Sequence, residues 1–454
     1  MRRTSLLSAT VLVVLALAPQ ASSPATAAGA GSVLVFFSAN DGIHGHELWK
    51  SDGTEVGTIM VKDIRSGEKG SNPALFAVIQ GRVFFAANDG RHGLRMWVSD
   101  GTADGTKLLK GSPPPLSENW SGGGSAVVRG SLYFTTHRRY RIWRTDGTMA
   151  GTFPLGIEGR CIASAGRTVF FVHNATSEVW RTDGTREGTF MLQRLRRPSA
   201  LFACPGFTDA RGTMFYEGRD VRHGYEPWKS DGTLGGTRLV QDIEPGPDSS
   251  HPSMLGSAGN QAFFVTGALW RTDGTKAGTV RLHRFRHWVG VLGGSPVLNG
   301  RFFFYTYAGG LGGEPWESDG TVDGTAMVKD IDPGGADSNP IGSAVLNGAL
   351  FFTADDGIHG DELWRTDGTE TGTSIVKDIN PGEGVSFPDH LVSSGGFLFF
   401  GANDGVHGFE LWKSDGTEAG TVMVKDINPS TSASNVLLTY LCASPSANAC
   451  HRLR

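Results

Sequence analysis

A tryptophan followed by x-(Ser/Thr)-Asp-Gly-Thr recurs nine times along this 454-residue chain. The tryptophans are Trp49, Trp97, Trp143, Trp180, Trp228, Trp270, Trp316, Trp364 and Trp412. All but one of the steps from each tryptophan to the next fall in the forties, and the step from Trp143 to Trp180 is shorter. A repeat period in the forties is typical of β-propeller blades, each of which is a four-stranded antiparallel sheet.

Each period contains four short runs rich in β-branched and aromatic residues, and no run has the periodicity of an amphipathic helix. In the second period these runs are ALFAVI, RVFFAAN, LRMWVSD and GTKLLK. The Asp-Gly-Thr block predicts a tight turn, since Asp accepts nearby backbone N–H groups and Gly adopts positive φ. We therefore predict an all-β fold, a single β-propeller of nine four-stranded blades.

The two ends of the repeat array predict how the ring closes. The array begins with a second-strand segment, SVLVFFSAN, and finishes with SNVLLTYLCAS, which matches the first-strand segment SNPALFAVIQG. We expect this last segment to supply the missing first strand of the first blade, because closure removes an open sheet edge. The predicted propeller spans residues 32–441, and residues 442–454 form a short tail.

Residues 1–28 have the features of a secretory signal peptide. MRR is a basic start, LLSATVLVVLALA is a short apolar run, and ATA is a small-residue cleavage site. No later apolar run reaches the roughly 20 residues that a membrane span needs. We therefore expect a secreted protein without a membrane span, and the formal net charge of −4 does not favour nucleic acid as a partner.

Export permits disulfides, and the chain has four cysteines. A bridge between Cys442 and Cys450 would close a short tail loop, and it is the pairing that we favour. Cys161 and Cys204 fall near equivalent places in successive repeats, so a bridge between these two also fits the repeat.

The phrases ELWKSDGT, ELWRTDGT and EPWKSDGT resemble the ELWxxDGT repeat of secreted bacterial proteins. The resemblance covers almost all of the chain after the signal peptide. It implies a repetitive extracellular β protein, and it supplies no established activity and no catalytic residue. Three copies depart from the Glu of the motif, at Arg95, Arg141 and Ala268.

The copies differ in the hairpin between the second and third runs. Six copies have a long hairpin, typified by ANDGIHG, which the third, fourth and sixth copies lack. Five of the six also carry both the motif Glu and an Asp in the phrase VKDI or its variants. These pairs are Glu47 and Asp63, Glu226 and Asp242, Glu314 and Asp330, Glu362 and Asp378, and Glu410 and Asp426.

Strand pairing of Trp49 with Val61 would place Glu47 opposite Asp63, beside the long hairpin. Two facing carboxylates repel unless something intervenes. In one interpretation, Asp63 accepts N–H groups of the NDGxHG turn and Glu47 meets His44 or a lysine, because short carboxylates often tie down loops.

In the other interpretation the carboxylates bind Ca²⁺, which takes six to eight oxygen ligands, backbone carbonyls and water among them. The ligands in the first copy would be Asn40 or Asp41, with Glu47 and Asp63. The equivalent Glu and Asp pairs would do the same in the other four copies. The spacing differs from that of an EF-hand, and Ca²⁺ is the sole candidate cofactor.

The short-hairpin copies are rich in arginine, in HRRYRIWR, QRLRRP and RLHRFRH. In the fourth copy, Glu178 is expected opposite Arg194 as an ion pair. One interpretation of this region is a docking patch for an anionic polymer, and the other is solvated arginines whose stems pack on the blade. The patch would consist of Arg194, Arg196, Arg197, Arg284 and Arg286.

We find no nucleophile elbow, phosphate loop, HExxH motif or carboxylate pair confined to one copy. An active site usually breaks repeat symmetry with one special cluster. We therefore expect a monomeric, non-enzymatic propeller that acts as a binding or adhesion scaffold for an extracellular glycan or protein. The alternatives are an extracellular polysaccharide hydrolase or lyase, by analogy of fold, and a purely structural cell-envelope protein.

Overall fold

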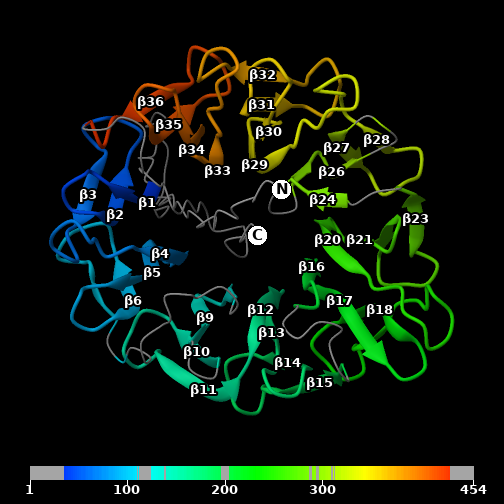
Figure 1. Cartoon of the computed structure of the whole chain (residues 1–454). Coiled ribbons are helices and arrows are strands. Elements are labelled where there is room, and N and C mark those ends of the chain that lie inside the picture. Colours follow the sequence, from blue (N-terminus) through cyan, green and yellow to red (C-terminus); the bar gives the residue numbers. More distant parts are fainter. Residues whose placement is uncertain are drawn as a thin grey trace, which may run out of the picture.

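The computed structural model describes residues 35–109, 111, 124–136, 140–195, 204–285, 289–292, 296–307, 310 and 312–429. Over these residues the chain forms 36 β-strands and no helix, so no helix crosses a membrane there. The strands form nine antiparallel sheets that follow one another around a ring (Figure 1). The predicted nine-bladed β-propeller is therefore confirmed.

The first five blades have these strands. Blade 1 contains β1 (Val35–Asn40), β2 (His46–Ser51) and β3 (Ile59–Lys62). Blade 2 contains β4 (Ala74–Ile79), β5 (Arg82–Asn88), β6 (Leu94–Ser99) and β7 (Lys107–Leu108). Blade 3 contains β8 (Ser125–Val128), β9 (Ser131–Thr136), β10 (Arg141–Thr145) and β11 (Phe153–Glu158). Blade 4 contains β12 (Arg160–Ala165), β13 (Thr168–Val172), β14 (Glu178–Thr182) and β15 (Phe190–Arg194). Blade 5 contains β16 (Thr208–Ala210), β17 (Thr213–Asp220), β18 (Gly224–Ser230) and β19 (Arg238–Leu239).

The remaining four blades complete the ring. Blade 6 contains β20 (Ser253–Ala258), β21 (Gln261–Val265), β22 (Leu269–Thr272) and β23 (Val280–His283). Blade 7 contains β24 (Val289–Val291), β25 (Val297–Leu298), β26 (Arg301–Tyr307), β27 (Gly313–Ser318) and β28 (Thr325–Met327), and both β24 and β25 pair with β26. Blade 8 contains β29 (Ile341–Leu346), β30 (Ala349–Ala354), β31 (Glu362–Thr366) and β32 (Ser374–Lys377). Blade 9 contains β33 (Asp389–Ser394), β34 (Phe397–Asn403), β35 (Phe409–Ser414) and β36 (Val422–Lys425).

Within each blade, strands that follow one another in the chain are neighbours, and the first strand lies nearest the centre of the ring (Figure 1). The Asp-Gly-Thr block makes the turn between the third and fourth strands, as predicted. In blade 1, Asp52 Oδ1 accepts from Thr54 N (2.8 Å) and Thr54 Oγ1 (2.6 Å). Gly53 has a φ of 85° there, and its N–H donates to Ser51 Oγ (2.9 Å).

The blades pack on each other through buried aromatic residues of their second strands. Phe84 in blade 2, for example, belongs to one core cluster with Leu132 and Phe134 of blade 3. The predicted register between the third and fourth strands is wrong by one residue. Trp49 lies opposite Met60 and not Val61, because a β-bulge follows Leu48.

The contact between blades 9 and 1 resembles the contact between blades 1 and 2. Lys50 Nζ donates to Gly101 O across the first contact (2.9 Å), and Lys413 Nζ donates to Gly53 O across the second (2.8 Å). Residues of β1 also share a core cluster with residues of β34 and β35. The ring of described blades is therefore continuous.

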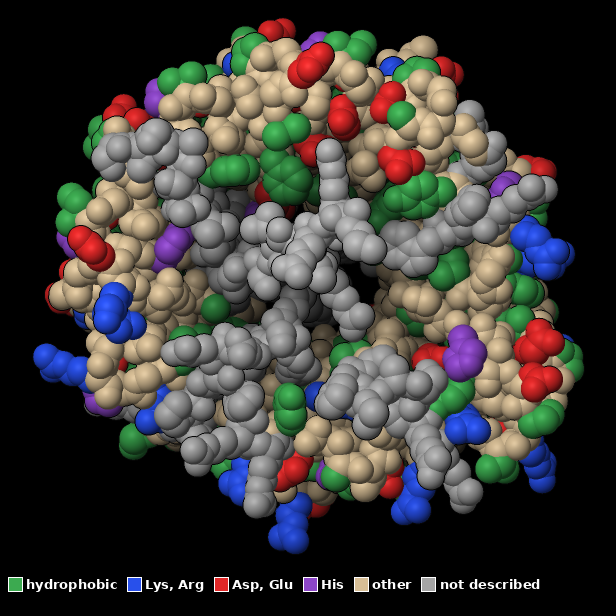
Figure 2. Space-filling model, viewed as in Figure 1, with side chains coloured by type: hydrophobic (Ala, Val, Ile, Leu, Met, Phe, Trp, Pro, Cys, Tyr) green, Lys and Arg blue, Asp and Glu red, His purple; other side chains and the backbone are tan. Residues whose placement is uncertain are grey.

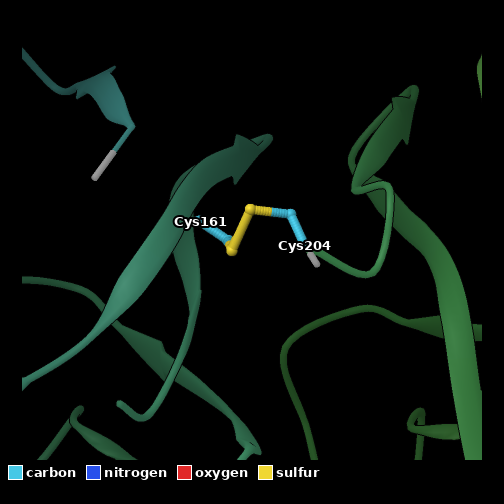
Figure 3. Close-up of a disulfide and its surroundings, with 2 residues drawn as sticks. All are labelled: Cys161 and Cys204. Carbon is cyan, nitrogen blue, oxygen red and sulfur yellow. A yellow bond between two sulfur atoms is a disulfide. The ribbon is translucent and has the colours of Figure 1, made fainter. Parts of the chain in front are cut away.

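The Cys161–Cys204 disulfide is present, with Cα atoms 5.5 Å apart, and it joins β12 to the segment that leads into β16 (Figure 3). Three further predictions fall on residues 1–34 and 430–454, outside the described part of the chain. They are the signal peptide, the closing strand SNVLLTYLCAS and the Cys442–Cys450 bridge.

Candidate functional site

The glutamate of the repeat motif binds the chain that leads to the next blade. Glu47 in β2 is fully buried. Its carboxylate accepts hydrogen bonds from the N–H groups of Ile64 (3.1 Å), Arg65 (3.0 Å) and Ser71 (2.8 Å), and from Ser71 Oγ (2.6 Å). These donors lie on the connector from blade 1 to blade 2. We call this arrangement, a motif Glu bound by the connector isoleucine and the connector serine, a glutamate clamp.

The clamp recurs with the same sequence spacing in blades 5, 7 and 8, at Glu226, Glu314 and Glu362. The isoleucine N–H donates at 2.8 to 3.0 Å in these three blades, and the serine Oγ donates at 2.7 Å. In blade 9, Glu410 accepts from Ile427 N (2.9 Å) and Asn428 N (3.3 Å).

Burial raises the pKa of four clamp carboxyls to about 7, and the donors of the connector act in the opposite direction. These four are Glu47, Glu314, Glu362 and Glu410. At Glu47, the connector N–H groups and the serine hydroxyl thus take the place where the calcium interpretation puts an ion.

The NDGxHG loop uses its own aspartate. Asp41 Oδ1 accepts from Ile43 N (3.0 Å) and His44 N (2.8 Å), and Asp41 Oδ2 lies 2.7 Å from His44 Nδ1. Burial raises the pKa of Asp41, but these hydrogen bonds lower it by more. The turn is therefore held by Asp41, and not by Asp63 as one interpretation expects.

The aspartate of VKDI keeps one carboxylate oxygen buried without a hydrogen-bond partner. These atoms are Oδ1 of Asp63, Asp242, Asp330, Asp378 and Asp426. Across the described ranges, no three side chains of His, Cys, Asp or Glu are placed to hold a metal ion. An ion here would therefore depend on one carboxylate oxygen with backbone carbonyls and water, a donor set that suits Ca²⁺. The calcium sites stay a prediction.

The predicted ion pair of blade 4 is confirmed. Arg194 Nε lies 3.2 Å from Glu178 Oε1, and Trp180 Nε1 donates to Glu178 Oε2 (3.1 Å). Arg284 is exposed after β23, whereas Arg196, Arg197 and Arg286 fall outside the described residues. Figure 2 shows Lys and Arg at the rim near β11 and β15, and acidic side chains over β29 to β32. The docking patch stays a prediction.

One cluster in blade 5 breaks the repeat, and the sequence analysis missed it. Glu217 Oε1 lies 3.0 Å from His251 Nδ1. The His251 ring stacks on the Tyr225 ring, with centroids 5.1 Å apart and planes 25° apart. The Arg219 guanidinium lies over the same tyrosine ring, 4.9 Å from its centroid. We call these four residues the blade-5 cluster.

The cluster has a buried base and a more exposed top. Tyr225 is 7% exposed, whereas the side chains of Glu217 and His251 are 22% and 52% exposed. Burial raises the pKa of Glu217, and the hydrogen bond from His251 offsets part of this shift. Burial also raises the pKa of Tyr225, against the charge of Arg219. Figure 2 shows histidine, acidic, basic and apolar side chains together over β17 and β18.

Strand register shows why the cluster is specific to blade 5. The positions equivalent to Glu217 in the other blades hold Ser38, Ala86, Thr135, Val172, Val265, Tyr305, Thr353 and Gly401. None of these is acidic. A carboxylate at a position that is otherwise small, apolar or neutral is the sequence pattern that could have revealed the cluster.

Comparisons with known proteins identify the architecture more than the protein. No family model matches the chain, and no curated protein matches it. Among solved structures, it is similar to a puromycin hydrolase (16% identity, 78% of this chain and 53% of that chain, TM-score 0.38). It is also similar to a puromycin-hydrolyzing peptidase of Mycobacterium tuberculosis (13%, 73% and 57%, 0.39) and to a prolyl endopeptidase (14%, 78% and 48%, 0.41).

The expectation of a non-enzymatic binding scaffold is wrong on this comparison, because the solved proteins in question are hydrolases and peptidases. The chain spans about half the length of these proteins. Since the identities are low, the likeness extends to the kind of fold alone, and it assigns no catalytic residue to this chain.

Proposed function

We propose that this chain is an enzyme that transfers a proton on an anionic substrate at the blade-5 cluster. The observation that carries the proposal is the Glu217–His251 pair, 3.0 Å apart, at one of nine otherwise equivalent positions. Active sites in repeat folds break the repeat in this way, with an acid and a base within hydrogen-bond reach.

Each residue of the cluster has a role that follows from its contacts. Because Nδ1 of His251 is bound to Glu217, Nε2 is the nitrogen that takes the proton from the substrate. The Glu217 carboxylate holds the ring orientation and stabilises the imidazolium that forms. Arg219 places a positive charge beside His251, which favours a substrate carboxylate or similar anion. Tyr225 is a positioning residue, because its ring contacts both Arg219 and His251 and is itself buried.

The proposal includes an extracellular location, which the disulfide Cys161–Cys204 supports because such bridges persist in oxidising compartments. The resemblance to the ELWxxDGT repeat family, the monomeric state and a glycan or protein partner stay predictions.

The test is a turnover assay with carboxylate-bearing peptides and uronic-acid oligosaccharides, each compared with its amide or methyl ester. We expect turnover of at least one anionic substrate, and His251→Gln should lower kcat/KM by roughly 10²- to 10⁴-fold. Glu217→Gln should change the pH profile of kcat, and Arg219→Gln should raise KM for the anionic substrate.

The matched control is His223→Gln. His223 is also in blade 5 and also pairs with an acid, since its Nδ1 lies 2.9 Å from Asp220 Oδ2, but it lies outside the cluster. It should leave turnover unchanged. No turnover of any substrate, or wild-type turnover by the His251 variant, would contradict the proposal.

A further inference from the structure

The inner edge of blade 1 is a surface that calls for a strand. Within the described residues, blade 1 has three strands and β1 pairs with β2 alone. In the other eight blades, the strand equivalent to β1 has a neighbour on its central side. Phe36 and Phe37 of β1 are fully buried, so this edge belongs to the packed core of the ring. An unpaired edge of this kind is a template for a further strand.

The glutamate clamps indicate where such a strand would come from. In blades 1, 5, 7 and 8 the clamp serine lies 24 residues after the glutamate. The same step from Glu410 leads to Ser434. Glu410 is fully buried and accepts the two N–H groups of Ile427 and Asn428, as the other clamps accept theirs at the same spacing.

A second spacing places the strand itself. The step from the end of β3 at Lys62 to the start of β4 at Ala74 equals the step from the end of β32 to the start of β33. The same step from Lys425, where β36 ends, leads to Leu437. The residue after each clamp serine also has positive φ, as in Asn72 (47°) and Asn339 (45°), and an asparagine follows Ser434. Asparagine tolerates this conformation better than most residues.

We propose that residues 437–442 of this same chain dock on β1 as the innermost strand of blade 1, held by a hydrogen bond from Ser434 to Glu410. By the register of β4 with β5, Leu437 faces Ser38 and Leu441 faces Val35. The strand docks within one molecule, because the connector from Lys425 to Leu437 has the length that serves elsewhere in the ring. This inference is independent of the proposed enzymatic function.

The test is hydrogen exchange of the full-length protein, read in the peptide that contains β1. Ser434→Ala removes a hydrogen bond to a charged group, which is worth about 1.5–3 kcal/mol, so exchange in β1 should become about 10- to 100-fold faster. The matched control is Ser432→Ala, which removes a nearby hydroxyl from the same segment and should leave exchange unchanged. Equal exchange in the Ser434 variant and the wild type would overturn the proposal.

A cross-link tests the register and the source of the strand. Ser38→Cys combined with Leu437→Cys should form a disulfide under mild oxidation, because facing residues in antiparallel strands bring Cα atoms within disulfide range. The product should run as a monomer on a non-reducing gel. A disulfide-linked dimer would show that the strand comes from a second copy, and the absence of any cross-link would show that the edge is not filled by this segment. Either result overturns the proposal.

Discussion

Blades 4 and 8 carry the same motif glutamate and use it differently. In blade 8, Glu362 is buried and accepts from Ile379 N (2.9 Å), Asn380 N (3.1 Å) and Ser386 Oγ (2.7 Å) of the connector. In blade 4, Glu178 pairs with Arg194, whose side chain is 70% exposed. The glutamate is therefore a clamp only where the connector passes over it.

The chain between blades 4 and 5 is attached in another way. The Cys161–Cys204 disulfide joins the innermost strand of blade 4 to the segment that leads into blade 5. Blades 4 and 8 thus show two solutions to one problem, which is to fix the crossing from one blade to the next. One solution is a buried carboxylate with backbone donors, and the other is a covalent bond.

The largest expected effect comes from removing a clamp. Glu362→Ala should lower the free energy of unfolding by roughly 3–5 kcal/mol, because it leaves two buried N–H groups and a hydroxyl without an acceptor. Glu178→Ala should lower it by about 1 kcal/mol or less, because its partner is an exposed arginine. Urea unfolding measures both values. Equal losses would show that the two glutamates do the same work.

The disulfide should come next in size. Cys161→Ser together with Cys204→Ser should lower the free energy of unfolding by about 2–4 kcal/mol, since the bridge closes a long loop in the unfolded chain. Reduction of the wild type should have a similar effect on the melting temperature. A reduced protein as stable as the oxidised one would show that blade 5 is held by its other contacts.

How stability depends on pH should also separate the two blades. The four clamp carboxyls have a pKa of about 7 in the folded protein, above their ordinary value of 4.5. A carboxyl raised on folding contributes stability that is present below its unfolded pKa and is lost as pH rises through the folded pKa. We therefore expect the free energy of unfolding to fall as pH rises from about 4.5 to 7.

Glu178 should behave in the opposite sense. Burial raises its pKa, but hydrogen bonds and the charge of Arg194 lower it overall, so its contribution is present above its unfolded pKa and is lost in acid. Urea unfolding at about pH 5 and about pH 7.5 measures the slope. Glu362→Gln should flatten the slope between these values and Glu178→Gln should not. A slope that is the same in both variants would argue against the clamps as its source.

The smallest effect concerns the aspartate beside the clamp. Asp378 Oδ2 accepts from Gly382 N (3.2 Å), whereas Oδ1 is buried without a partner. In chelator, Asp378→Asn should change the free energy of unfolding by about 1 kcal/mol or less, because it removes a charge that no donor fully compensates. Added Ca²⁺ should raise the melting temperature of the wild type more than that of the variant. A melting temperature that does not respond to Ca²⁺ would remove the calcium prediction.

The sequence was sufficient for the ring and less so for the clamps. The Trp and Asp-Gly-Thr spacing reports local hairpins, so nine blades follow from it directly. Glu47 and Asp63 could be placed at one end of blade 1 by strand pairing. Their donors could not be identified, because the connector's path depends on where the next blade packs.

The blade-5 cluster was out of reach for a similar reason. Glu217 and Tyr225 lie on paired strands, but His251 joins them only after the connector has crossed above the blade. A comparison of residue types at equivalent strand positions would have marked Glu217 as unusual. It would not have shown that a histidine 34 residues later is its partner.

A double-mutant cycle between Glu362 and Ser386 tests the clamp most directly. The two single alanine variants and the double variant are unfolded in urea, and the coupling energy is the difference between the double loss and the sum of the single losses. We predict a coupling of about 1.5–3 kcal/mol, because the serine hydroxyl donates to a buried carboxylate. Losses that add to within about 0.5 kcal/mol would contradict the account of these glutamates as clamps.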